Sequence, residues 1–181
     1  FNPKYPIRIV ETATPNRHCE GMFYGFMRGY EGQPISLTPE MVDFSQAMLI
    51  QDTFSNAYFD TITADFSNAV SLWGAFQQHK AVNQEKTTRA IYLKVTEKCT
   101  NFTGAFNQCS NLEELQFTAD SIIAAQIDVA DCKKLSHESL MSILYALKDG
   151  ANLTCTLGKL NLAKLTDAEK AIATQKGWTL A

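Results

Sequence analysis

Apolar and polar residues alternate in short quartets along the first two thirds of the chain. The quartets are VDFS from Val42, ADFS from Ala64, LKVT from Leu93 and LQFT from Leu115. In each quartet the first and third residues are apolar, which is the pattern of a strand with one buried face. A weaker fifth match, IDVA, begins at Ile127. We therefore predict short strands at these positions, with their polar residues facing solvent.

A phenylalanine precedes each of the first four quartets, so the pattern repeats. These residues are Phe23, Phe54, Phe76 and Phe106. Self-similarity at a fixed interval is the signature of repeat architectures, in which one unit stacks on the next. We expect the four phenylalanines to fill the interior between stacked units.

The segment between two quartets, NAVSLWGAFQQ at Asn68–Gln78, is typical of a short helix or turn. Helical spacing would place Val70, Trp73, Phe76 and Gln77 on one side. We therefore expect Trp73 to belong to the core.

Two units are longer than the others, and the surplus falls at the same phase in both. The insertions are Met27–Pro39 and Gln77–Thr88. Insertions at one phase of a repeat protein emerge on one face and often carry binding residues. They also fit tolerated surface loops, because loop length costs little stability.

The last third of the chain changes character. A helix is predicted over residues 136–150, where a serine cap precedes leucine and isoleucine residues at helical spacing. A second helix begins at the capping box of Thr166 and Glu169 and ends at Gly177. Short strands are expected within Cys155–Leu160 and in the final WTL. This region fits a cap that covers the open end of a stack.

The stretch GAFNQCSNLEELQF at Gly104–Phe117 resembles the AF-x-x-C-x-x-L-x-x-L-x-apolar unit of bacterial BspA-like leucine-rich repeat proteins. ADFSNAVSLWGAF looks like a variant of that unit, and residues 131–149 and 165–181 resemble the C-terminal cap that follows such repeats. The resemblance runs from about Met41 to Ala181. The first two repeats depart from it, because they lack the cysteine. The residues that match the unit are Ala105, Phe106, Cys109, Leu112, Leu115 and Phe117.

The repeat and the resemblance together lead us to expect an α/β solenoid, a leucine-rich-repeat-like stack of short parallel strands with short helices or turns and a helical C-terminal cap. Residues 1–40 would form an N-terminal cap or an irregular first repeat, in which Tyr5–Glu11 is a candidate strand. Residues 41–135 would form the leucine-rich repeats and residues 136–181 the cap, within one continuous domain.

Composition excludes several classes of function. The formal charge of −3 and a pI near 5.6 give no electrostatic reason to expect a nucleic-acid partner. No apolar run approaches the roughly 18–20 residues of a membrane-spanning helix, so we expect no membrane insertion. The sequence begins at Phe1 without a methionine, which suggests a processed or excised fragment.

The chain lacks recognisable catalytic or metal-binding motifs. Its five cysteines contain no CxxC pair and are expected to be buried. The histidines, His18, His79 and His137, have no metal-binding spacing relative to one another. Neighbouring Glu113 and Glu114 would face opposite sides of a strand and could not form a catalytic pair. We therefore predict no catalytic residue, no metal and no cofactor. An enzyme would require a polar pocket, such as one gathering His18, Cys19 and an acid.

The resemblance implies an extracellular, non-enzymatic adhesion module on or secreted from a bacterial cell, which binds a protein or glycan of a host or another cell. A phage tail or other virion component, which would be structural or receptor-binding, is the alternative, and we would expect it to be an obligate trimer. The candidate ligand-binding residues lie on the strand face and in the two insertions. They are Asp43, Asp65, Tyr92, Lys94 and Gln116 on the strand face, and Arg28, Tyr30, His79 and Lys80 in the insertions.

Overall fold

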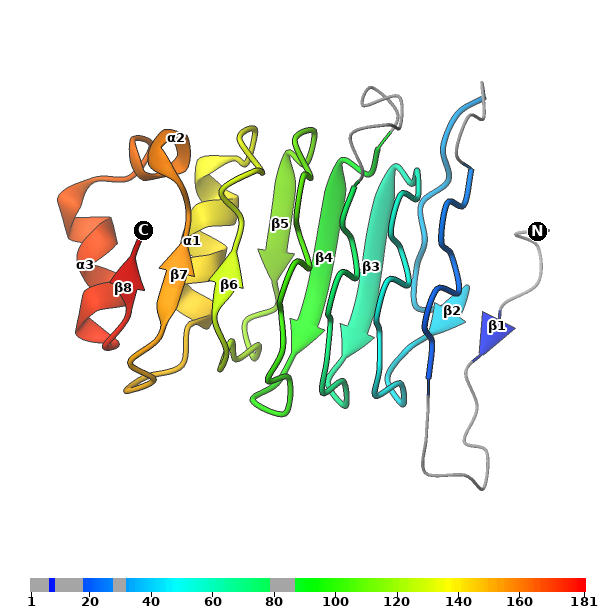
Figure 1. The fold of residues 1–181 in the computed structure, drawn as a ribbon, viewed down its shortest axis with the longest axis horizontal. Coiled ribbons are helices and arrows are strands. Elements are labelled where there is room, and N and C mark those ends of the chain that lie inside the picture. Colours follow the sequence, from blue (N-terminus) through cyan, green and yellow to red (C-terminus); the bar gives the residue numbers. More distant parts are fainter. Residues whose placement is uncertain (1–6, 9–17, 28–31, 79–86) are drawn as a thin grey trace.

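The computed structural model describes residues 7–8, 18–27, 32–78 and 87–181. Within this part of the chain, eight short strands and three short helices follow one another (Figure 1). The strands β3, β4 and β5 come before the first helix, and the helices belong to the C-terminal third. The elements are β1 (Ile7–Arg8), β2 (Val42–Asp43), β3 (Thr61–Phe66), β4 (Ala90–Val95), β5 (Glu114–Phe117), β6 (Ile127–Asp128), α1 (His137–Ala146), β7 (Thr154–Thr156), α2 (Lys159–Leu162), α3 (Asp167–Gln175) and β8 (Thr179–Leu180).

The strands form three separate parallel sheets, ordered β1-β2, β3-β4-β5 and β6-β7-β8. The expectation of a leucine-rich-repeat-like α/β solenoid is therefore wrong, and the structure is a small α/β domain. Alternation of apolar and polar residues identifies a strand but not its neighbour. The strand predicted at Ile127 pairs with β7 rather than with β5.

Helix α1 lies along the edge of β5, where another strand would have to pair. The backbone N–H of Leu115 donates to the Oγ of Ser139 at 2.9 Å, and the N–H of Phe117 donates to the Oγ of Ser142 at 2.8 Å. An unpaired strand edge is a template for further pairing. The two serine hydroxyls satisfy this edge and end the β3-β4-β5 sheet.

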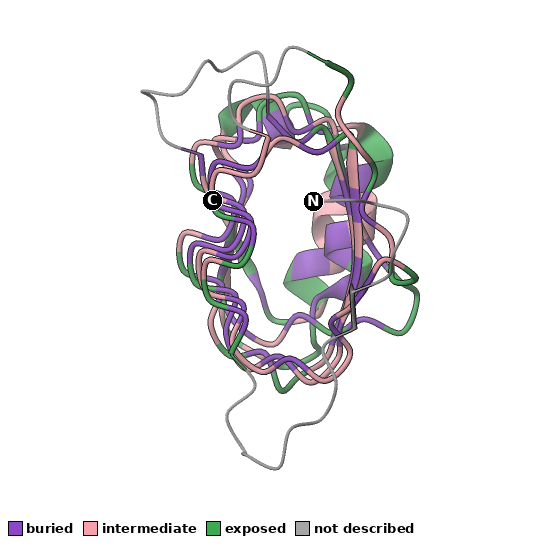
Figure 2. Cartoon of the chain, turned by 90° about the vertical axis from the view of Figure 1, so that its right-hand side faces the viewer, coloured by how far each residue is buried: buried purple, intermediate pink, exposed green. Residues whose placement is uncertain are grey.

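A ladder of turn segments runs on the other side of the core. We call residues 18–26, 49–56, 71–78 and 101–108 the turn segments. Parallel bridges join His18 to Leu49, Leu49 to Ser71, and Ser71 to Asn101. In the end-on view of Figure 2 the turn segments nest along one side, and the strands and helices lie along the other.

The core lies between these two sides. The rings of Phe23, Phe54, Phe76 and Phe106 stack in that order, with neighbouring centroids 5.6, 5.3 and 5.5 Å apart. The expectation that the four phenylalanines are core residues is confirmed. The predicted inward positions of the strands are also buried, namely Val42, Phe44, Ala64, Phe66, Leu93, Val95, Leu115 and Phe117.

The segment Asn68–Gln78 is not helical, and Trp73 is not a core residue. The backbone of Gly74 is left-handed, with φ of +61°, which interrupts a right-handed helix. The segment instead forms turns, in which Leu72 and Gly74 donate hydrogen bonds to the next turn segment. The Trp73 side chain points outward and is 43% exposed.

The C-terminal predictions are largely confirmed. Ser136 caps α1, and Thr166 with Glu169 forms the capping box of α3. Helix α1 ends at Ala146, before Gly150, because Leu147 takes an extended backbone and bridges to Ile123. The short helix α2 was not predicted.

Candidate binding surface

Polar side chains project from the outer side of the β3-β4-β5 sheet. We call this side the strand face. Its central row is Thr63, Tyr92 and Gln116, which are register partners across the three strands. Asp65 and Lys94 are partners in the next row. Because the neighbouring residues in each strand are buried, this face presents a regular array whose positions are set by backbone pairing.

Three of the predicted strand-face residues, Tyr92, Lys94 and Gln116, thus share one sheet with Asp65. Asp43 does not, because it lies on β2, which pairs with β1 in a different sheet. The Oδ1 atoms of Asp43 and Asp65 accept the N–H groups of Ser45 and Ser67 at 2.9 and 2.8 Å. Both carboxylates therefore hold the turns that end their strands. The predicted insertion residues Arg28, Tyr30, His79 and Lys80 lie outside the described residues.

The phenol of Tyr92 is held by a carboxylate on the neighbouring strand. Its hydroxyl donates a hydrogen bond to Oε2 of Glu114. This hydrogen bond, together with burial and the charge of Glu114, raises the pKa of Tyr92. The hydrogen bond therefore fixes the direction of the tyrosine ring, and the residue stays partly exposed.

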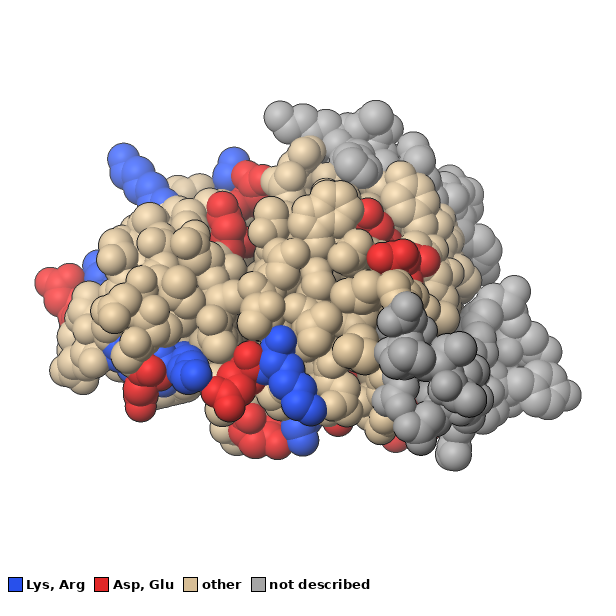
Figure 3. Space-filling model, turned by 60° about the horizontal axis from the view of Figure 1, so that its bottom comes forward, with Lys and Arg blue, Asp and Glu red and all other residues tan. Residues whose placement is uncertain are grey.

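Lys94 is also paired. Its Nζ lies 2.8 Å from Oδ2 of Asp120. The contact with Asp120, with a smaller effect of Asp65, raises the pKa of Lys94, and the same pair lowers the pKa of Asp120. Figure 3 shows that basic and acidic side chains lie next to one another on the lower edge of the molecule rather than in patches of one sign.

A small polar cavity opens at the amino ends of β3, β4 and β5. It has a volume of about 150 Å³. A guanidinium, an aromatic ring and carboxylates line it, and the Nη2 of Arg89 lies 3.0 Å from Oε2 of Glu113. We call it the strand-end pocket. Its lining residues are Asp60, Thr61, Arg89, Ala90, Tyr92, Glu113 and Glu114.

Sequence reasoning missed most of this pocket, although a signal was present. Asp60, Arg89 and Glu113 each come directly before a strand, so a charged residue recurs at one position of the repeat. Glu113 precedes β5, so the alternation that predicted Glu113 and Glu114 on opposite sides of a strand does not extend to it. Both residues line the same cavity.

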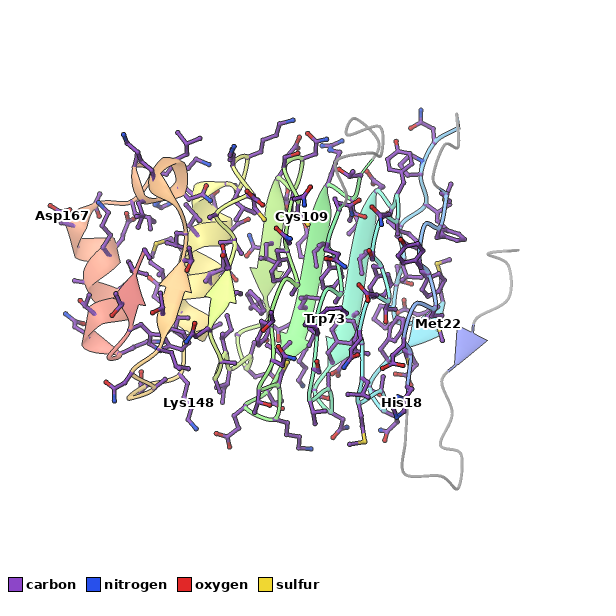
Figure 4. All side chains as sticks on the ribbon, in the orientation of Figure 1. His18, Met22, Trp73, Cys109, Lys148 and Asp167 are labelled. Atoms are coloured by element: carbon purple, nitrogen blue, oxygen red, sulfur yellow. The ribbon has the colours of Figure 1, made fainter. Side chains whose placement is uncertain are left out.

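Within the described residues, which leave out His79, the histidines and cysteines do not form a common site. His18 and Cys109 lie far apart in Figure 4. His137 Nε2 is 2.9 Å from Glu169 Oε1. Cys19 is buried, and burial raises the pKa of its thiol to about 11. All five cysteines are free and buried, as expected.

The described residues contain no group of three or more histidine, cysteine or acidic side chains suited to a metal ion. In the same part of the chain, no helix is both long and apolar enough to cross a membrane. Comparisons of the chain with family models, curated proteins and solved structures found no match.

Proposed function

We propose that this protein is a non-enzymatic binding module that recognises a protein or glycan ligand through the strand face. The strand-end pocket is the observation that carries the proposal. It combines one aromatic ring with hydrogen-bond donors and acceptors of both signs, set on the amino-terminal parts of β3, β4 and β5 and on the residues directly before them. Recognition sites of this kind use a few convergent polar groups to orient a ligand.

Tyr92 and Arg89 are the residues through which we expect a ligand to bind. Tyrosine and arginine are enriched among residues that dominate binding energy. Glu114 fixes the phenol of Tyr92, and Glu113 holds the guanidinium of Arg89. Because both side chains are held before a ligand arrives, little conformational freedom is lost on binding. The second insertion, Gln77–Thr88, ends directly before Arg89, so it is joined to the pocket by the chain itself.

The bacterial surface, or secretion from a bacterium, is the location that we propose, on the resemblance of Gly104–Phe117 to BspA-like repeats. The cysteines support a binding role over catalysis by a thiol. Burial is the main factor that raises the pKa values of Cys99 and Cys155, each to about 12. A thiol that stays protonated is a poor nucleophile.

The proposal is tested by probing an array of glycans and host extracellular proteins with the wild type and with an Arg89→Gln/Tyr92→Phe variant. The matched control is Glu97→Gln/Lys148→Gln, which removes an exposed 2.8 Å ion pair elsewhere. We expect the pocket variant to lose at least roughly tenfold in affinity for the array ligand and the control to bind as the wild type does. Equal binding by all three proteins would refute the proposal. An obligate trimer in solution would favour a virion component instead.

A further inference from the structure

The turn segments are joined by a regular row of backbone hydrogen bonds. In each of the first three segments, every second N–H group donates to a carbonyl of the next segment. Phe76, for example, donates to the carbonyl of Ala105 at 2.9 Å. The donors are Cys19, Gly21, Phe23 and Gly25; Ile50, Asp52, Phe54 and Asn56; and Leu72, Gly74, Phe76 and Gln78.

The fourth turn segment breaks this row. Its equivalent donors are Phe102, Gly104, Phe106 and Gln108, and the segment that follows is residues 123–131. Gln108 N–H reaches the side chain of Asp131, whose Oδ2 accepts it at 3.0 Å. The N–H groups of Phe102, Gly104 and Phe106 have no hydrogen-bond partner among the described residues. By the geometry of the earlier segments, these three groups point toward residues 123–131.

A cleft separates the two segments at this place. One part, of about 310 Å³, is bordered by Gly104, Phe106 and Asn107 on one side and by Asp128, Ala130 and Asp131 on the other. A second part, of about 440 Å³, lies between residues 100–103 and residues 124–126. Both parts follow the same pair of segments, so the row of unpaired donors borders the cleft.

We propose that this cleft, which we call the ladder cleft, binds an extended peptide of a partner protein that carries a lysine or arginine. Alternate N–H donors along one edge match the alternate carbonyls of a strand, and peptides add to unpaired edges in this way. The backbone would supply hydrogen bonds to any sequence. The surface lies on the other side of the core from the strand-end pocket and would act independently of it.

The negative charge of the ladder cleft favours a lysine or arginine in the bound peptide. Asp128 is exposed and Asp131 is half-buried, and both line the cleft. The nearby Lys134 is turned to Asn111, with its Nζ 2.7 Å from Oδ1. Unpaired N–H groups alone could attract an anion, but two carboxylates beside them oppose it. A neutral peptide backbone with a cationic side chain satisfies the donors and the acids together.

Amide hydrogen exchange tests the unpaired donors in the free protein. We expect the amides of Gly104 and Phe106 to exchange at least roughly tenfold faster than those of Gly74 and Phe76, their bonded equivalents. Equal protection of the two pairs would show a closed ladder and overturn the proposal.

The peptide is found with a display library of random heptapeptides, selected on the wild type and counter-selected on Gly104→Asn. Asparagine tolerates a left-handed backbone, and Asp52 already occupies the equivalent position with φ of 51°. The Asp52 side chain reaches Gln77 of the next turn segment at 2.6 Å, so a side chain at position 104 would extend across the cleft.

We expect the selected peptides to share a lysine or arginine and to slow exchange at Gly104 and Phe106 in the full chain. Asp128→Asn, which keeps the oxygen that accepts the N–H of Ala130 at 2.9 Å, should weaken their binding roughly tenfold. Failure to select any peptide, or selected peptides that leave these amides unchanged or bind Asp128→Asn equally well, would overturn the proposal.

Discussion

Phe54 and Phe76 stack with ring centroids 5.3 Å apart and ring planes 4° apart. Each belongs to a different turn segment, and each also stacks on a further phenylalanine, Phe23 on one side and Phe106 on the other. The stack therefore ties four turn segments together through one column of rings. Buried aromatic side chains of this kind dominate the energetics of a core.

Removing one ring from the middle of this column should be costly. Phe76→Ala is expected to lower the free energy of unfolding by about 3–5 kcal/mol, because it creates a cavity and breaks the ring contacts with Phe54, Phe66 and Phe106. Trp73→Ala is the control within the same segment, since Trp73 projects into solvent and should cost less than about 1 kcal/mol. Urea unfolding followed by circular dichroism measures both. Equal losses would contradict the assignment of Trp73 to the surface.

The contrast between these two aromatic residues shows what the sequence pattern could and could not predict. Period-two alternation located β2 to β6 and their buried residues because it reflects the pleat of a strand directly. It could not predict that Gly74 adopts a left-handed backbone, which turns Trp73 outward. Ser139 and Ser142 look like ordinary helix residues in the sequence, and their bonds to β5 depend on how the chain returns. The alternation pattern therefore could not predict which elements pair with each strand.

The candidate site was predicted unevenly for the same reason. The positions of Tyr92 and Lys94 on the strand face follow from the alternation within β4, and that of Gln116 follows from the alternation within β5. Arg89 and Glu113 lie just outside the alternating quartets, where no periodicity applies, and their meeting depends on the parallel register of β4 and β5. Charged residues that recur directly before successive strands therefore indicate a candidate site as well as those within the strands do.

Gly74 is required for space as well as for backbone conformation. Its φ is +61°, and a β-carbon there would lie 2.6 Å from Oδ1 of Asp52 and 2.9 Å from Nε2 of Gln77. Gly104 has a similar φ of +65°, but a β-carbon there would meet nothing within 4 Å. Gly104→Ala should therefore cost about 1–2 kcal/mol from backbone strain. Gly74→Ala should cost at least about 1 kcal/mol more, because it also displaces the Asp52–Gln77 hydrogen bond.

Thermal or urea unfolding of the two alanine variants separates the two contributions. If steric contact matters as stated, adding Gln77→Ala to Gly74→Ala should recover part of the extra loss, because the flexible side chain that must move is gone. Identical stabilities of the Gly74 and Gly104 variants would contradict the steric argument.

The serines of α1 should stabilise the edge of β5. Ser139 is fully buried, and its hydroxyl accepts the N–H of Leu115. Ser139→Ala would leave that N–H unsatisfied in the core, at a cost of about 1–3 kcal/mol. Thr174→Ala is the control, because the Thr174 hydroxyl is exposed and bonds only within α3. Hydrogen exchange at Leu115 should accelerate in the Ser139 variant alone, and an unchanged rate there would show that the hydroxyl does not protect the edge.

The capping box of α3 should make stability depend on pH on the acid side. Hydrogen bonds from the N–H and hydroxyl of Thr166, and then the contact with His137, lower the pKa of Glu169 below its ordinary value of 4.5. A carboxylate whose pKa is lower in the folded state stabilises the fold fully above its unfolded pKa, and this stabilisation is lost as pH falls through the folded pKa. Glu169→Gln keeps an acceptor for the cap but removes the charge.

The urea midpoint of Glu169→Gln should therefore lie below that of the wild type at about pH 7, and the difference should shrink as the pH is lowered toward about 3. His137→Ala tests the smaller contribution, because it removes the imidazole 2.9 Å from the carboxylate and leaves the Thr166 bonds in place. It should reduce the acid dependence only in part. A difference between wild type and Glu169→Gln that stays constant across this pH range would show that the carboxylate charge does not stabilise the cap.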